Sequence, residues 1–293
     1  MLQPDSEQWR QDGEFLRFHG YRLFSRSGGQ GEPLLLIHGF PTSSFDWAGL
    51  WPELASRQQV HAIDMLGFGL SDKPVQFAYS AAASADQWQA LAQTKGIREA
   101  DVLAHDYGDT VAQELLARQR EGRLPFRIRS VVFLNGGLFP EATYPLRLQK
   151  MLLGPFGPVV ARLSSFGSFA GSMRRICATP PGDDELRQHW RLLTRAGGRK
   201  VLPKLIGYIR ERRVFRERWL EALQHAGIPL CLIDGVADPI SGASIVQRWR
   251  ELLPNASVVA LDGVGHYPQW EAPARVLAAF RAFADARDGS ISG

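Results

Sequence analysis

One short stretch decides how this sequence folds: LAHDYGDT, residues 103–110. The apolar run Asp101–Ala104 predicts a buried strand, and the apolar spacing of Thr110–Arg120 predicts a helix. Asp106 lies at the turn between them, with small residues two positions to either side. A strand, a sharp turn and a helix in this order place the apex side chain at the carboxyl end of a sheet, a position typical of a catalytic nucleophile.

An aspartate at this apex favours a particular chemistry. A carboxylate can displace a leaving group at a saturated carbon, which forms an ester between enzyme and substrate. Water must then attack that ester, and the oxyanion develops on the carboxyl group of Asp106 itself. We expect the backbone N–H groups of Tyr107 and Phe40 to stabilise this oxyanion, since Phe40 follows another buried strand, Leu34–Ile37.

Two further residues complete a triad in the order nucleophile, acid, base. His266, in the segment GVGHYP, follows the last predicted strand and is the expected base. Asp238, in DGVADP, follows the strand before it and is the expected acid, whereas Asp234 falls inside the end of that strand. All three residues lie on loops between strands and helices at one end of a sheet, where folds of this class bind ligands.

Strands and helices alternate along most of the chain, which predicts a parallel sheet covered on both faces. We expect core strands at 34–37, 60–64, 101–104, 130–134, 229–234 and 257–261, and helices at 80–94, 110–120, 243–253 and 272–284. Residues 14–19 and 21–25 predict an antiparallel edge hairpin. No core strand is evident between 135 and 224. We therefore predict an α/β core of residues 1–135 and 225–293, with residues 136–224 inserted as a helical cap.

Composition excludes several other classes of protein. The chain has 293 residues, 45% of them hydrophobic and 22% charged, with a formal charge of +4, which suits one large globular α/β domain. The arginine-rich segment 210–218 contains interleaved glutamates, and we interpret it as a solvated helix face rather than a site for an anionic partner. Nucleic-acid binding is not indicated. Two cysteines, Cys177 and Cys231, match no metal or redox spacing.

The same composition leads to four expectations about surroundings and partners. The N-terminus lacks the apolar core of a signal peptide, and no apolar run approaches the length of a membrane span. We therefore expect a cytoplasmic protein without stable membrane insertion. Neither a cofactor nor a metal site is expected. The partner should be a small hydrophobic substrate rather than nucleic acid, and the sequence leaves a homodimer open.

Several motifs resemble one branch of a known superfamily. HGFP, GFGLSDKP, HDYGD and GHYPQ are similar to the epoxide hydrolases and haloalkane dehalogenases of the α/β-hydrolase superfamily. Longer runs, HGFPTSSFDW, HDYGDTVAQELL and NGGLFPE among them, most closely resemble the mesoderm-specific transcript protein family. The similarity extends from Gly31 to Phe283. It implies an α/β-hydrolase fold: a mostly parallel eight-stranded sheet flanked by helices, with an inserted helical cap.

The resemblance to epoxide hydrolases implies a proton donor in the cap. In that family two cap tyrosines protonate the ring oxygen as the epoxide opens, because their hydroxyl groups stay protonated near neutrality. Tyr208 matches the second of these tyrosines, and Tyr144 is a looser match to the first. The predicted reaction is the hydrolysis of an epoxide to a vicinal diol. Asp106 attacks, Tyr208 donates with help from Tyr144, and His266, oriented by Asp238, activates water.

Other interpretations stay open at this point. Haloalkane dehalogenases usually carry tryptophan after the nucleophile and often asparagine in the HG-x-P motif, whereas this chain has Tyr107 and Phe40. Trp47 and Tyr107 nevertheless keep haloalkane or haloacid dehalogenation as an alternative, and a non-catalytic binding module is another. His38, Trp47 and His105 are expected around the substrate pocket, with His38 ordering the oxyanion loop. The alternative for either cap tyrosine is a purely structural role, in which its ring packs against a helix.

Overall fold

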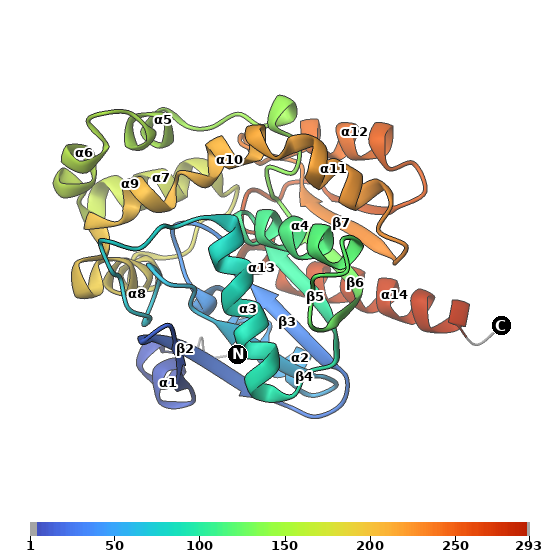
Figure 1. The fold of residues 1–293 in the computed structure, drawn as a ribbon. Helices are drawn as coiled ribbons and strands as arrows, with labels where there is room; N and C mark the ends of the chain where they lie inside the picture. Colours follow the sequence, from blue (N-terminus) through green and yellow to red (C-terminus); the bar gives the residue numbers. More distant parts are fainter. Residues whose placement is uncertain (1–4, 292–293) are drawn as a thin grey trace.

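A computed structural model describes residues 5–291 of the protein. Its centre is an eight-stranded sheet in the order β1-β2-β4-β3-β5-β6-β7-β8 (Figure 1). The strands are β1 (Glu14–Phe18), β2 (Tyr21–Gly28), β3 (Pro33–Ile37), β4 (Gln59–Ile63), β5 (Glu99–His105), β6 (Arg127–Leu134), β7 (Leu230–Gly235) and β8 (Ser257–Leu261). Strand β2 pairs antiparallel with both of its neighbours, and all other pairs are parallel. The predicted fold class, a mostly parallel eight-stranded sheet with flanking helices, is confirmed.

The sheet buries side chains on both faces, because helices cover each of them. In β3, Leu35 and Ile37 belong to one hydrophobic core, and Leu34 and Leu36 belong to the other. Such alternation follows from the two-residue period of a strand. The first core includes residues of α3 (Ala81–Lys95), α4 (Tyr107–Arg120) and α12 (Ala243–Leu252). The second includes residues of α1 (Ser6–Gln11), α2 (Trp51–Ala55) and α14 (Pro273–Ile291).

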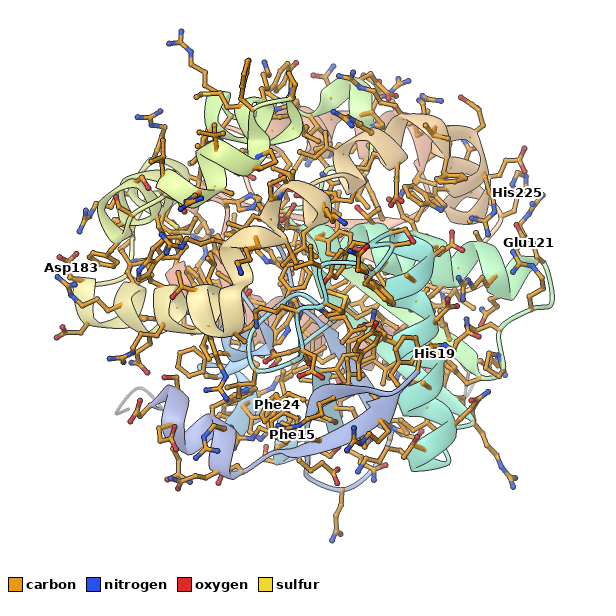
Figure 2. The ribbon with its side chains drawn as sticks, turned by 60° about the vertical axis from the view of Figure 1, so that its left-hand side comes forward. Phe15, His19, Phe24, Glu121, Asp183 and His225 are labelled. Atoms are coloured by element: carbon orange, nitrogen blue, oxygen red, sulfur yellow. The ribbon has the colours of Figure 1, made fainter. Side chains whose placement is uncertain are left out.

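The predicted core elements are present with small changes at their ends. Helix α4 begins at Tyr107, three residues before the predicted start, because the turn at Asp106 leads directly into it. The predicted edge hairpin is β1 and β2, in which Phe15 and Phe24 face each other across the pair, with ring centroids 5.6 Å apart (Figure 2).

Helix α1 was not predicted, and one tryptophan explains why it packs against the core. Trp9 is buried, and its indole N–H donates to Ser44 Oγ at 3.2 Å. Its ring meets that of Trp51 edge to face at 5.1 Å between centroids. A six-residue helix has little stability in isolation, so tertiary contacts of this kind must hold it in place.

Between β6 and β7 the described chain forms helices and loops but no strand. These helices are η2 (Pro140–Ala142), α5 (Arg147–Leu153), α6 (Gly157–Leu163), α7 (Phe166–Ile176), α8 (Asp183–Thr194), η3 (Arg195–Lys200), α9 (Leu202–Leu205), α10 (Tyr208–Val214) and α11 (Arg216–Gln224). They lie together along one side of the molecule (Figure 1). We use the word cap for residues 136–224. In the part of the chain from 5 to 291, every helix is too short or too polar to cross a bilayer.

Candidate active site

The turn at Asp106 holds its backbone in a strained conformation. Asp106 has φ 48° and ψ −103°, outside the regions that a non-glycine residue ordinarily adopts. Such a conformation costs roughly 1–3 kcal/mol and persists only where the surroundings enforce it. The Asp106 N–H donates to Leu134 O at 3.1 Å, and a side chain at Gly108 would collide with the Ile37 carbonyl. The sharp turn therefore requires a glycine at position 108.

One of the two expected oxyanion donors contacts the carboxylate directly. The Phe40 N–H donates to Asp106 Oδ2 at 3.1 Å. The Asp106 side chain makes no capping bond to the first N–H groups of α4, so Tyr107 N–H is not a partner of the resting carboxylate. The Tyr107 hydroxyl is 2.8 Å from Ser84 Oγ instead. His38 braces the loop before Phe40, since its Nδ1 lies 2.8 Å from Gly39 O and its Nε2 accepts from Met65 N–H at 3.1 Å.

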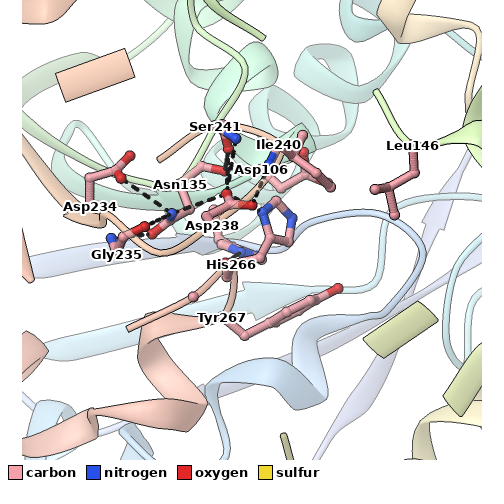
Figure 3. Close-up of polar contacts among 12 residues, drawn as sticks. Asp106, Asn135, Leu146, Asp234, Gly235, Asp238, Ile240, Ser241, His266 and Tyr267 are labelled. Atoms are coloured by element: carbon pink, nitrogen blue, oxygen red, sulfur yellow. Dashed lines mark hydrogen bonds and ion pairs between the residues drawn. The ribbon is translucent and has the colours of Figure 1, made fainter. Parts of the chain in front are cut away.

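His266 and Asp238 form a buried hydrogen-bonded pair (Figure 3). His266 Nδ1 lies 2.7 Å from Asp238 Oδ2, which leaves Nε2 free to act on water. Burial alone would lower the pKa of His266, but the charge of Asp238 and this hydrogen bond outweigh it and raise the pKa. Burial would likewise raise the pKa of Asp238, yet His266 and the N–H of Ile240 lower it overall. Both shifts favour an imidazole held in one orientation beside an ionised acid.

Asn135 connects Asp238 to strand β7, a role that no motif in the sequence indicated. Its Nδ2 donates to Asp238 Oδ2 at 3.2 Å and to Gly235 O at 3.1 Å, and its Oδ1 accepts from Gly235 N–H at 2.8 Å (Figure 3). The Ser241 hydroxyl adds a bond of 2.7 Å to the same carboxylate oxygen. Asn135 has φ 42°, a left-handed conformation that asparagine tolerates better than most residues. The position of an asparagine directly after a core strand was the available signal.

His105 holds the backbone of His266 in place. Its Nε2 lies 2.8 Å from the backbone oxygen of His266 and is the donor, since that oxygen can only accept. Burial lowers the pKa of His105 to about 3, so the ring is neutral near pH 7. The His266 N–H donates in turn to Ile176 O, at the end of the cap helix α7, at 2.9 Å. The backbone of the base is thus fixed from both the core and the cap.

The cap helix α10 places Tyr208 against the nucleophile. The Tyr208 side chain is buried, with its ring centroid 4.6 Å from that of Tyr107 and 5.9 Å from that of Phe40. Burial raises the pKa of Tyr208 well above its ordinary value, and the nearby charge of Asp106 raises it further. A phenol in this setting stays protonated and can donate to an oxygen anion.

Arg212 corrects the interpretation of the arginine-rich segment as a solvated face. Its side chain is only 4% exposed, and Nη2 donates to Asp106 O at 2.9 Å and lies 3.4 Å from Asp106 Oδ1. Its Nε donates to Thr110 Oγ1 at 2.8 Å, and its guanidinium lies 4.6 Å from the centroid of the Tyr208 ring. Tyr208 and Arg212 are four residues apart and share one face of the helix. That spacing from a predicted site residue was the missed signal.

A largely apolar cavity extends from the oxyanion loop and the base into the cap. Phe40, Ile240 and His266 line its core side, and its cap side includes Leu146, Leu152 and Met173 among others. The cavity has a volume of about 90 Å³, several times the roughly 10–15 Å³ that one water requires. It is therefore suited to a small hydrophobic molecule.

Several predicted site residues do not line this cavity. His38, Trp47 and His105 are completely buried and lie outside its lining, as do the buried Asp106 and Tyr208, so their place around the substrate stays a prediction. The structure also does not bring Tyr144 to the other residues, because its side chain is 60% exposed. The loop from β6 to α5 holds Tyr144 by its backbone N–H, which donates to Ile240 O at 2.9 Å.

Acid, histidine and cysteine side chains form no cluster of three or more suited to a metal ion within residues 5–291. The polar groups gathered at this site are instead a carboxylate with a donor at each oxygen, an acid–imidazole pair, a phenol and a guanidinium. Such a set can attack carbon, take a proton from water and donate a proton to a leaving oxygen.

Comparison with known proteins identifies relatives over nearly the whole chain. A family described as "alpha/beta hydrolase fold" matches residues 32–273. The mesoderm-specific transcript homolog protein of Bos taurus is 39% identical over 298 residues, covering 96% of this chain and 88% of that protein. The putative hydrolase LipZ of Mycobacterium tuberculosis is 40% identical over 276 residues, covering 93% and 96% respectively.

Solved structures of lower identity share the fold. The epoxide hydrolase CorEH aligns with a TM-score of 0.76 at 21% identity, over 94% of this chain and 99% of that one. The haloalkane dehalogenase DbeA of Bradyrhizobium elkani aligns with a TM-score of 0.78 at 19% identity, over 95% and 99%. The resemblance stated from the sequence motifs is confirmed.

Proposed function

The chain belongs to the α/β-hydrolase fold family and is a hydrolase of that superfamily, and on this premise we propose that it converts an epoxide and water to a vicinal diol through an ester on Asp106. The observation that carries the choice of an epoxide is the buried Tyr208 ring, which packs against Tyr107 and Phe40 next to Asp106. An opening epoxide needs a proton at its ring oxygen, and a protonated phenol beside Asp106 can supply it.

In the first step Asp106 attacks a ring carbon of the epoxide. Oδ2 accepts the N–H of Phe40, so Oδ1 is the oxygen that forms the new bond to carbon. The carbon–oxygen bond of the ring breaks, and the ring oxygen takes a proton from the Tyr208 hydroxyl. The products are a hydroxyalkyl ester of Asp106 and a tyrosinate.

Arg212 supports this step by remaining charged while the negative charge moves. Ester formation removes the charge of Asp106 and transfers it through the ring oxygen to Tyr208. Burial raises the pKa of Tyr208 most strongly, and the charge of Arg212 acts in the opposite direction. The guanidinium against the Tyr208 ring therefore stabilises the tyrosinate after its carboxylate partner has been neutralised.

In the second step water cleaves the ester. His266 removes a proton from water, and the hydroxide attacks Cγ of Asp106. The oxyanion forms on Oδ2, where the Phe40 N–H already donates. Collapse of this intermediate releases the diol, whose departing oxygen takes the proton from His266. The new carboxyl group of Asp106 gives its proton to the tyrosinate, which restores both Asp106 and Tyr208. The sum of both steps is one epoxide plus one water to one diol.

Trapping the ester tests the proposal directly. In His266→Gln the first step should proceed and the second should stop, so that incubation with an aryl epoxide adds the mass of the epoxide to the peptide that contains Asp106. His225→Gln is a matched control, because His225 is exposed at the end of α11 and should turn over normally. An unmodified Asp106 in His266→Gln, with a substrate that the unaltered enzyme hydrolyses, would rule out the ester mechanism.

The choice of leaving group has a separate test. Tyr208→Phe removes the proton donor and should slow epoxide opening by about 10²-fold or more. Halide release from bromoalkanes, measured in parallel, needs no proton donor and should change far less. Equal losses in both assays would show that the Tyr208 ring acts by packing, and halide release without any diol formation would favour the dehalogenase alternative.

A further inference from the structure

The outer surface of helices α5 and α6 exposes an unusual number of apolar side chains. Among the described residues eight large hydrophobic side chains are exposed, and seven of them lie in the cap. Four belong to this hairpin: Met151 at 55%, Phe156 at 73%, Val159 at 55% and Leu163 at 76% exposure. Apolar side chains grouped in this way on a folded protein commonly mark a surface that meets a partner or a membrane. We call these four residues, with the basic residues described next, the α5–α6 surface.

Positive charge surrounds the same apolar side chains. Residues 142–182 contain no aspartate or glutamate, and Arg147, Lys150 and Arg162 lie on the two helices. Folding adds two more cations from later in the chain. Arg199 Nη1 donates to the carbonyl oxygen of Arg162 at 3.2 Å, and Arg210 donates to that of Leu153, so each caps the end of one helix.

This charge is part of an imbalance between the two parts of the chain. The cap, residues 136–224, has 16 arginine and lysine residues and 7 aspartate and glutamate residues, a formal charge of +9. The remaining chain has 18 and 23, a formal charge of −5. The modest total of +4 therefore hides a strongly basic cap. A surface that is both apolar and basic fits the interface of an anionic bilayer, where apolar side chains enter the headgroup layer and cations meet acidic lipids.

The inner side of the same hairpin lines the cavity. Leu146 and Leu152, at and within α5, and Val160 of α6 face the cavity that ends at His266, whereas Phe156 and Leu163 face outward. Figure 1 shows α5 and α6 at one edge of the molecule, away from the sheet. Two short helices therefore form the wall between the outer apolar surface and the catalytic groups.

We propose that the α5–α6 surface docks this protein onto bilayers that contain anionic phospholipid, and that its apolar substrate enters the cavity from the lipid. The entry of the substrate from the lipid rests on the proposed function, whereas the docking of the protein onto the bilayer does not. Docking at the cap would place the cavity wall against the phase in which an apolar epoxide concentrates. The docking is peripheral, through side chains of a short helical hairpin.

Flotation with vesicles tests the docking without any turnover, so a failure of the proposed reaction would leave it standing. The unaltered protein should float with vesicles of phosphatidylcholine and phosphatidylglycerol at least about tenfold more than with phosphatidylcholine alone, and added salt should release it. The double variants Phe156→Ser with Leu163→Ser and Arg147→Glu with Lys150→Glu should each lose most of this binding. Phe156→Ser alone should lose part of it, which guards against misfolding of the double variant.

Matched controls lie on the core. Val75→Ser removes an exposed apolar side chain, and Arg98→Glu reverses an exposed charge, each outside residues 136–224 and outside the α5–α6 surface. Both should bind vesicles as the unaltered protein does, and thermal unfolding of every variant checks that it is folded. Equal binding to both kinds of vesicle, or binding to neither, would overturn the proposal. Sedimentation of an unbound protein as a dimer that Phe156→Ser dissociates would assign the surface to a second copy of the chain instead.

Discussion

The carboxyl edge of the sheet and the cap helix α10 meet at one site, but they hold their residues by different means. Asp106 and Asp238 are fixed by backbone hydrogen bonds in loops that directly follow core strands. Tyr208 and Arg212 come from a seven-residue helix and are fixed by ring packing and by bonds from the guanidinium. In the proposed reaction the core thus supplies the nucleophile and the base, and the cap supplies a proton donor and a positive charge.

This difference predicts a division of labour between the two steps of the reaction. The groups of α10 stand beside the carboxylate while it is attacking, when charge leaves Asp106. The pair of His266 and Asp238 acts only when water attacks the ester. Substitutions of Tyr208 or Arg212 in the cap should therefore slow ester formation. Substitutions of His266 or Asp238 in the core should slow ester hydrolysis. Single-turnover kinetics separates the two steps.

The largest effect is expected for Asp238→Asn, which should slow ester hydrolysis by about 10³-fold or more because the imidazole loses its orienting acid. The pH dependence should change as well. Asp238 raises the pKa of His266, so its removal lowers that pKa, and the neutral imidazole persists to lower pH. The acidic limb of ester hydrolysis should then move to lower pH, as rapid-quench measurement of ester decay across pH would show.

Asp234→Asn is the control for this prediction. Burial raises the pKa of Asp234 well above its ordinary value and so favours its uncharged form, which an asparagine side chain resembles in charge. Its Oδ1 accepts from Asn135 at 3.3 Å, a bond that an asparagine side chain can also accept. An equal shift of the pH limb in Asp234→Asn would show that the limb does not report the pair of Asp238 and His266.

A smaller effect is expected in the cap. Arg212→Gln should slow ester formation by about 10²-fold, since a positive charge next to the developing negative charge is lost. Arg212→Lys should recover part of the rate because it restores the charge without the two-pronged geometry. Ester hydrolysis should change little in either variant. If Arg212→Gln slowed only hydrolysis of the trapped ester, the division between core and cap would be wrong.

The smallest effect comes from a glycine that makes room for Arg212. A Cβ at Gly137 would collide with Nη1 of Arg212, so Gly137→Ala should push the guanidinium away from Asp106. We expect ester formation to slow by about tenfold, in the same direction as the loss of the arginine itself. Gly171→Ala in the cap helix α7 is the matched control, because a Cβ there would meet nothing within 4 Å. Additive losses in Gly137→Ala combined with Arg212→Gln would contradict this coupling.

Much of the core could be predicted because local rules decide it. The turn chemistry around Asp106, the alternation of apolar strands with helices, and the order of the loops at Asp238 and His266 are all written in short segments of sequence. The strand ends were the least accurate: β6 begins at Arg127 rather than Ser130. Backbone pairing with β5 extends β6 beyond its apolar run, to Arg127. No local sequence pattern shows where that pairing begins.

The cap was harder to predict, because its short helices have few turns from which a buried face can be recognised. Arg212 sits among charged residues that mostly are exposed, so charge pattern alone predicted a solvated face for all of them. Tyr208 matched the cap tyrosines of epoxide hydrolases more closely than Tyr144 did, but only the structure shows that Tyr208 is buried and Tyr144 is exposed. Which side of a seven-residue helix faces inward depends on what it packs against.

The sequence by itself determined the α/β fold, the strained turn that presents Asp106 and the strand-end loops that carry Asp238 and His266. These follow from backbone geometry and apolar periodicity, which act between residues close together in the chain. Only the tertiary structure decided that Arg212 contacts the nucleophile, that Asn135 holds the acid, and that the basic and apolar side chains of the cap share one surface. Those arrangements join segments up to about a hundred residues apart, and packing, rather than local propensity, sets contacts at that separation.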